Sequence, residues 1–248
     1  DLHSFPTRRS SDLLSWLNTN SNGYTLIYST IIVVVVAFLL AFVFKALKPL
    51  QDINVALDKK KQLLYALNIR DISDEEAARK YKEVVLADEI IDTKGNVTTK
   101  GEQGGEKAGF LLNSADYKAG RLALFVCKVD GQTKYIVPVY GMGLWGPING
   151  FIALDADKNT VYGAYFNHEG ETAGLGAEIK DNVKWQNLFK GKKVFAKGTQ
   201  KVALSVVKKV DDPSTQVDVV TGATLTSDGV SDMLIEGLSK YLVFLTSK

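Results

Sequence analysis

Residues 122–140, LALFVCKVDGQTKYIVPVY, decide the fold class. Two runs rich in β-branched and aromatic residues flank Asp130-Gly131, a dipeptide that is typical of tight turns between antiparallel strands. A second pair of such runs, FIALDAD (151–157) and TVYGAYFNH (160–168), follows soon after. These segments therefore predict two β-hairpins in one antiparallel sheet.

Helical patterns precede these strands. Apolar residues recur at helical spacing over 50–69, and Ser73 to Glu76 has the form of a capping box that begins a helix reaching about Leu86. Residues 92–120 are rich in Gly and Lys and weakly patterned, so we expect a mobile loop or an irregular excursion there.

The chain after residue 168 alternates short elements and closes with a helix. The expected elements are a short helix over 182–190, a strand over 201–209, a short strand over 217–220 and a helix from Thr226 or Ser227 to about Thr246. Helices, then strands, then a closing helix predict an α+β domain with a largely antiparallel sheet and flanking helices.

A membrane segment lies near the N-terminus. Residues 24–44 read YTLIYSTIIVVVVAFLLAFVF and carry no charge. A segment of this length can cross a bilayer as a single helix. A buried core helix is the alternative. A cleaved signal peptide fits less well because no small-residue cleavage site follows. The lysines just after the segment would place the C-terminal part in the cytoplasm by the positive-inside rule.

Composition excludes several classes of function. The 248 residues carry a formal net charge of +2, which argues against electrostatic capture of nucleic acid, so no nucleic-acid partner is expected. A single cysteine, Cys127, excludes an internal disulfide, a cysteine zinc site and a thiolate iron–sulfur cluster. Two histidines exclude a His-cluster metal site and leave carboxylates as the remaining metal ligands. No metal site and no catalytic residue are expected in this chain. Redox chemistry would therefore need an organic cofactor. Cys127 itself fits a small core residue within a strand.

The chain divides by pattern into four parts. Residues 1–17 match nothing that follows and look like a non-native leader, so they are excluded from fold reasoning. Residues 18–48 hold the membrane segment, 49–120 form a helical and irregular part, and 121–248 form the domain core.

The stretch DVVTGATLTS (218–227) offers a site for a phosphate. A strand ends, small residues allow close backbone approach, and a helix begins, whose first N–H groups are unpaired and carry partial positive charge. The alternative is an ordinary turn in which Thr224, Thr226 or Ser227 is the helix N-cap.

This stretch resembles the flavinylation motif of the FMN-binding domain family. Asp218, Thr221, Gly222, Ala223 and Thr224 fill every fixed place of the motif. The resemblance implies that Thr224 carries FMN through a phosphoester, that a flavin transferase attaches it from FAD, and that Asp218 belongs to what the transferase recognises. Thr226 is kept as a second candidate for the attachment.

Two further segments resemble the same family. Residues 141–147 are similar to its Gly-x-Gly-Leu-Trp segment, and residues 170–176 to its Glu-Thr-Pro-Gly-Leu-Gly turn, with Ala173 in place of Pro. A flat apolar ring needs an apolar wall and a few backbone partners. The residues expected to provide them are Leu144, Trp145, Thr172, Gly174, Leu175 and Gly176. The alternatives are core packing for Trp145 and a plain hairpin connection for the glycine-rich turn.

The order of the motifs and the N-terminal span resemble the C subunits of sodium-translocating NADH:quinone oxidoreductases. This implies a single-pass, covalent FMN protein in the inner membrane, with its FMN domain on the periplasmic side despite the lysines. It would relay electrons from NADH toward ubiquinone or menaquinone, coupled to sodium export, among other subunits and membrane lipid, and would be incomplete as an enzyme alone. The alternatives are the related G subunit of an ion-translocating ferredoxin:NAD oxidoreductase and a non-redox, membrane-anchored binding protein.

Overall fold

The computed structural model describes residues 21–247, which form two compact units that meet in sequence at residues 55 and 56. The units are treated one at a time. The leader expected at 1–17 lies outside the described residues.

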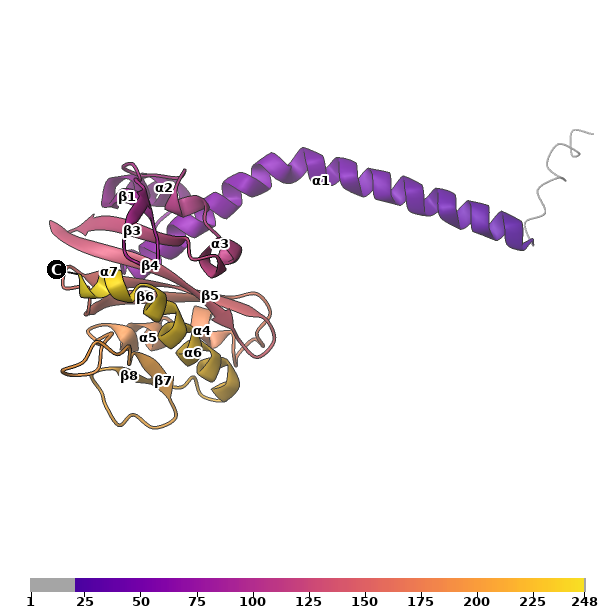
Figure 1. Cartoon of the computed structure of the whole chain (residues 1–248). Coiled ribbons are helices and arrows are strands. Elements are labelled where there is room, and N and C mark those ends of the chain that lie inside the picture. Colours follow the sequence, from indigo (N-terminus) through magenta and orange to yellow (C-terminus); the bar gives the residue numbers. More distant parts are fainter. Residues whose placement is uncertain (1–20, 248) are drawn as a thin grey trace, which may run out of the picture. The chain divides into compact units, whose positions relative to one another are not determined.

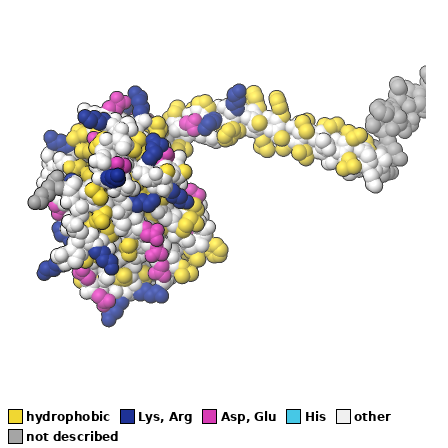
Figure 2. Space-filling model, viewed as in Figure 1, with side chains coloured by type: hydrophobic (Ala, Val, Ile, Leu, Met, Phe, Trp, Pro, Cys, Tyr) yellow, Lys and Arg dark blue, Asp and Glu magenta, His cyan; other side chains and the backbone are white. Residues whose placement is uncertain are grey.

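The first unit holds helix α1 (Asn22–Ala66) as far as Val55, which includes the apolar span. Its side chains are exposed over the predicted span, with Leu26 68% and Phe38 72% accessible, and no charged side chain interrupts this stretch (Figure 2). Within residues 21–247, α1 is the one helix that is long and apolar enough to cross a membrane. A helix that is apolar on all sides and not buried is stable in lipid. The buried-core alternative is not supported, because none of the apolar window is buried in the described residues.

Helix α1 continues without a break past the predicted span, so the prediction of a separate helix over 50–69 is wrong in its bounds. Pro49 lies inside the helix, which ends at Ala66. There Asn68 adopts a left-handed conformation (φ 60°), and the N–H of Ile69 donates to the carbonyl of Leu64 at 2.9 Å. This pattern closes the last carbonyls of a helix and stops it.

The second unit contains a six-stranded antiparallel sheet in the order β2-β1-β3-β4-β5-β6 (Figure 1). Its strands are β1 (Val85–Ile91), β2 (Val97–Thr99), β3 (Leu122–Val129), β4 (Gln132–Met142), β5 (Pro147–Asp155) and β6 (Val161–His168). Both predicted hairpins are confirmed. Asp130 and Gly131 have φ of 50° and 78°, as a two-residue turn of the hairpin type requires.

The segment between α1 and β3 contains secondary-structure elements that the sequence did not predict. Helix α2 (Asp74–Val84) begins with the predicted capping box, since Ser73 and Glu76 exchange both hydrogen bonds. Residues 92–120 hold β2, a 3₁₀ turn η2 (Gly109–Leu111) and α3 (Ser114–Lys118), so the prediction of an irregular excursion is wrong for these residues. Strand β1 replaces the last residues of the expected second helix.

The elements after β6 are short until the last helix. They are α4 (Glu178–Asp181), α5 (Val183–Gln186), η3 (Asn187–Phe189), β7 (Ser205–Val207), β8 (Gln216–Asp218), α6 (Thr224–Lys240) and α7 (Leu242–Thr246). Strands β7 and β8 pair in parallel, unlike the main sheet. The strand predicted over 201–209 is limited to β7, and the closing helix begins earlier than expected and is interrupted at Tyr241.

Both faces of the sheet are buried. Neighbouring residues alternate between two cores: Phe125 and Tyr165 pack on the side of α2 and the end of α1, whereas Leu124 and Phe166 pack on the side of α6. A strand buried on both faces appears as a nearly continuous apolar run. Cys127 is fully buried, which confirms it as a core residue.

Candidate functional site

The three motif segments meet at one end of the sheet. The first joins β4 to β5, the second follows β6 and the third leads into α6. A Cβ added to Gly222 would lie 2.9 Å from Leu175 Cδ2, and one added to Gly176 would lie 2.6 Å from Thr226 Oγ1. A Cβ on Gly229 in α6 would collide with the carbonyl oxygen of Met142. Glycines thus allow these segments to approach one another closely.

Thr224 is the first residue of α6 and its side chain is half-buried. Within residues 21–247 its hydroxyl makes no hydrogen bond, and α6 has no side-chain cap. The N-cap alternative is therefore wrong. Thr226 donates its hydroxyl to Glu171 Oε2 at 2.5 Å, and Ser227 Oγ accepts from the N–H of Val220 at 3.1 Å. Of these three hydroxyls, that of Thr224 is therefore the one left available at this end of the helix.

The residues just before Thr224 form a compact turn. Gly222 has φ of 77°, which favours glycine, and the buried Ala223 donates its N–H to the carbonyl of Val220 at 3.0 Å. Thr221 is exposed. Asp218 ends β8 with an exposed side chain, while its carbonyl accepts from Trp185 Nε1 at 2.8 Å.

The three side chains expected to provide an apolar wall are open to solvent. Leu144, Trp145 and Leu175 are 47%, 69% and 43% exposed, so core packing is wrong for Trp145. Met142 and Leu225, which the sequence did not single out, are exposed by more than 60% on the same motif segments or beside them. Several large apolar side chains exposed on neighbouring segments are typical of a surface that binds a ligand or a protein partner.

The glycine-rich turn keeps its shape without proline. The N–H of Leu175 donates to the carbonyl of Thr172 at 3.1 Å, and Gly174 has φ of 71°, as the third residue of a type II turn requires. Ala173 occupies the position where proline is favoured but not needed. The hydroxyl of Thr172 is exposed and makes no hydrogen bond within residues 21–247.

A carboxylate that sequence reasoning passed over lies at the centre of the site. Glu171 is 7% exposed and accepts hydrogen bonds from the N–H of Trp145 at 2.8 Å and from Thr226. The sequence signal that could have singled it out is a glutamate inside the turn at 170–176, which also holds three glycines.

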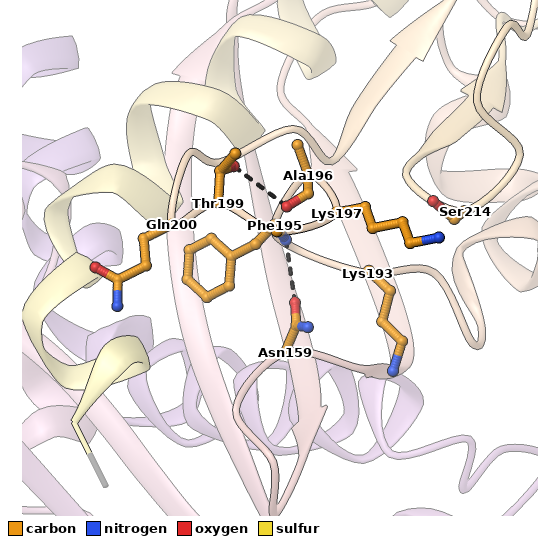
Figure 3. Close-up of a pocket in the computed structure, with 9 residues that line it drawn as sticks. Asn159, Lys193, Phe195, Ala196, Lys197, Thr199, Gln200 and Ser214 are labelled. Atoms are coloured by element: carbon orange, nitrogen blue, oxygen red, sulfur yellow. Dashed lines mark hydrogen bonds between the residues drawn. The ribbon is translucent and has the colours of Figure 1, made fainter.

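A cavity of about 620 Å³ lies elsewhere in the unit and shares no residue with the motif segments (Figure 3). Its walls bond to their own loops: Asn159 Oδ1 accepts from the N–H of Phe195 at 3.0 Å, and Thr199 donates to the carbonyl of Ala196 at 3.2 Å. No motif residue faces it, so the motif segments remain the candidate site.

Comparisons with known proteins identify the family. Residues 143–239 match the FMN-binding domain family. The chain is 32% identical over 230 residues to the C subunit of the Na(+)-translocating NADH-quinone reductase of Haemophilus ducreyi, with 87% of this chain and 89% of that protein covered. The chain belongs to this family of C subunits.

Solved structures of the family have the same fold. The crystal structure of the C subunit from Parabacteroides distasonis is 41% identical, with a TM-score of 0.73, and covers 82% of this chain and 98% of that chain. The structure of Shewanella oneidensis NqrC is 25% identical with a TM-score of 0.62 and covers 79% of this chain and 100% of that chain. The predicted family and α+β fold are therefore confirmed, and this protein has an FMN-binding domain that contains every candidate site residue.

Two glycines of this protein provide a matched test of the site's packing. Gly222 and Gly174 both have positive φ, but only a Cβ at Gly222 meets a neighbour, Leu175. We expect Gly174→Ala and Gly222→Ala each to lower the free energy of unfolding by about 1 kcal/mol, because alanine is strained at positive φ. Denaturant unfolding of the full chain in detergent measures this.

Only Gly222→Ala should also lower the yield of covalently bound flavin, because it displaces the Leu175 side chain that lies against Gly222, two residues before Thr224. Equal flavin yields in the two variants would contradict the view that the contact between Gly222 and Leu175 belongs to the site.

Proposed function

We propose that this protein carries FMN on Thr224 through a phosphoester and serves as an electron-carrying subunit of its reductase, on the way from NADH to quinone and coupled to sodium export. The observation that carries the proposal is the half-buried, unbonded hydroxyl of Thr224 at the start of α6. The neighbouring Thr226 is a poorer candidate, since its hydroxyl is buried and engaged.

The residues present fit the phosphate end of FMN. The N–H groups of Thr224, Leu225 and Thr226 have no acceptor within residues 21–247. The first turn of a helix favours a phosphate through these donors and through the helix dipole.

The residues present also fit the ring end. Isoalloxazine is flat and largely apolar with polar edges, and Leu144, Trp145 and Leu175 offer exposed apolar surface on two of the motif segments. The turn at Thr172–Gly176 offers backbone groups and a free hydroxyl for the ring edge. When bound, FMN supplies one-electron and two-electron redox chemistry, while the protein fixes its position and sets its potential.

Attachment is the work of a flavin transferase that uses FAD. The hydroxyl oxygen of Thr224 would form the new ester bond to the FMN phosphorus as the pyrophosphate bond of FAD breaks, and AMP and the hydroxyl proton would be released. The exposed carboxylate of Asp218 lies in the same motif, six residues before Thr224, and is available for recognition by this enzyme.

The two alternatives are less well supported. Relatives from Haemophilus ducreyi, Pseudomonas aeruginosa and Pasteurella multocida are C subunits of Na(+)-translocating NADH-quinone reductases, which does not favour the ferredoxin:NAD type. A non-redox binding protein would leave the TGAT turn as a helix cap, and in the part of the chain that the structure describes no side chain caps α6. The remaining subunits of the reductase and membrane lipid are the expected partners.

A denaturing gel tests the proposal. The full chain expressed together with a flavin transferase should give a band that fluoresces under ultraviolet light, because an ester bond survives unfolding. The same chain expressed without the transferase is the control. A colourless band in the presence of an active transferase would overturn the proposed function.

The location of the FMN domain on the periplasmic side can be tested with one introduced cysteine. Gln200 is exposed, while the single native cysteine, Cys127, is fully buried. We expect a membrane-impermeant maleimide to label Gln200→Cys in intact spheroplasts and to leave the parent chain unlabelled. Labelling of Gln200→Cys only after lysis would place the domain in the cytoplasm, as the lysines after the span suggest.

A further inference from the structure

The buried carboxylate of Glu171 connects segments that are far apart in the sequence. Trp145, which donates to Oε1, is 26 residues away, and Thr226, which donates to Oε2, is 55 residues away. Glutamates are seldom buried unless they are paired or fully hydrogen-bonded. Here each oxygen has one donor, and the two donors come from different segments of the site.

The chain makes room for this carboxylate with two glycines. A Cβ on Gly143 would collide with Oε1 of Glu171, and a Cβ on Gly176 would lie 2.5 Å from Oε2. Any side chain at either position would push the carboxylate out of its place. The backbone of Glu171 is fixed as well, because its N–H donates to Nδ1 of His168 at 3.2 Å.

We propose that Glu171 is a positioning residue that holds the Trp145 turn and the first turn of α6 in fixed relation. It acts through the N–H of Trp145 and the hydroxyl of Thr226, two residues after the attachment residue Thr224. The inference rests on the proposed function, since it assigns to Glu171 the relation between the FMN tether and the apolar wall. Glu171 need not touch the cofactor.

The role follows from what a carboxylate can do at this place. An ionised carboxylate only accepts hydrogen bonds, and both of its oxygens are used. Without it, the buried hydroxyl of Thr226 and the N–H of Trp145 lose their acceptor. The exposed turn that carries Trp145 then moves independently of α6, and the ring of a tethered flavin loses a fixed wall.

Glutamine can replace Glu171 in this role. Its carbonyl oxygen accepts from the N–H of Trp145, and its amide donates to Thr226, whose hydroxyl can also accept. Alanine can do neither. A geometric role therefore predicts that Glu171→Gln is close to the parent and that Glu171→Ala is not.

The test uses the full chain in detergent, expressed with a flavin transferase, in four forms: parent, Glu171→Ala, Glu171→Gln and Glu169→Ala. Glu169 is an exposed glutamate two residues earlier whose side chain makes no hydrogen bond within residues 21–247, so it is the matched control. The readouts are flavin per chain on a denaturing gel, the visible circular dichroism of the bound flavin, and hydrogen exchange of the 143–146 turn. Exchange is measured on chains expressed without the transferase.

In Glu171→Ala we expect flavin per chain to stay near that of the parent. The visible circular dichroism should fall by about half or more, and exchange in the 143–146 turn should rise by about tenfold, because the acceptor of the Trp145 N–H is lost. Glu171→Gln and Glu169→Ala should match the parent in all three readouts. A simple loss of fold stability would not change the circular dichroism of chains that remain folded.

Parent-like circular dichroism and exchange in Glu171→Ala would overturn the inference. So would a Glu171→Gln variant as impaired as Glu171→Ala, since the charge rather than the geometry would then matter. If the parent itself carries no flavin, the proposed function fails. The exchange measurement still decides whether Glu171 holds the turn.

Discussion

The Thr224→Ala variant is expected to carry no covalently bound flavin. The substitution removes the hydroxyl that forms the proposed ester, and the next two hydroxyls along α6 are engaged. Ser227 accepts from Val220, and Thr226 is held by Glu171. Flavin fluorescence of the band on a denaturing gel should fall to background, whereas the parent band fluoresces.

The fold should survive this change. Thr224 is half-buried, does not cap α6 and makes no side-chain hydrogen bond within residues 21–247, so the free energy of unfolding should change by less than about 0.5 kcal/mol. Thr224→Ser keeps the hydroxyl and should retain flavin. Thr226→Ala is the control that distinguishes Thr224 from Thr226 as the attachment residue. Fluorescence that persists in Thr224→Ala but is lost in Thr226→Ala would move the attachment to Thr226.

The reductase should lose its physiological reaction in the same variant. A complex assembled with Thr224→Ala should transfer electrons from NADH to quinone at less than about 1% of the parent rate, because one carrier is absent. Assembly of the complex, checked by size, is the control. Near-parent activity in an assembled complex without flavin on this protein would contradict its role as a carrier.

The Asp88→Ala variant is expected to be the most unstable of the simple variants. Asp88 is fully buried, and its Oδ2 accepts from the N–H groups of Ala108 at 2.9 Å and Phe110 at 3.2 Å. The segment around it is glycine-rich because Cβ atoms at Gly101 and Gly105 would collide with Asp88. Asp88 thus fastens the 101–110 loop to β1.

Removing this carboxylate leaves two buried N–H groups without an acceptor. It also leaves Lys59 without an opposing charge: burial lowers the pKa of Lys59 to about 8, and Asp88 opposes that shift. We expect a loss of about 3 kcal/mol in the free energy of unfolding. Guanidinium unfolding of the full chain, followed by fluorescence of the buried Trp185, measures it.

A neighbour on the same strand provides the control. Glu89 is half-buried and its side chain makes no hydrogen bond within residues 21–247, so Glu89→Ala should change stability by less than about 0.5 kcal/mol. Asp88→Asn should lose less than Asp88→Ala, because the amide oxygen still accepts. Equal, small losses in Asp88→Ala and Glu89→Ala would show that the loop does not depend on Asp88.

The sequence predicted those parts of the fold that local chemistry determines. Asp130-Gly131 supplies the two positive φ values of a hairpin turn, and Ser73 with Glu76 closes a capping box between residues three apart. The contact between Asp88 and the 101–110 loop is not local, since the two N–H groups that Asp88 accepts from are 20 and 22 residues away. That segment therefore looked irregular. The continuity of α1 through Pro49 was missed for a different reason: proline is a strong but not absolute helix breaker.

The candidate site divides in the same way. Physical chemistry alone pointed to a phosphate site before the last helix but could not separate it from a helix cap, and the resemblance to the FMN-binding family singled out Thr224. The exposure of Trp145 and the absence of a cap on α6 became visible only in the structure. Glu171 was missed because its importance lies in donors from two distant segments, which no spacing along the chain reveals.

The mass of the peptide spanning residues 218–240, taken from the natively assembled reductase, tests the central claim most directly. The account predicts a peptide heavier than its sequence by one FMN less one water, with the added mass on Thr224 in the fragment spectrum. An unmodified peptide from an active, intact complex would contradict it.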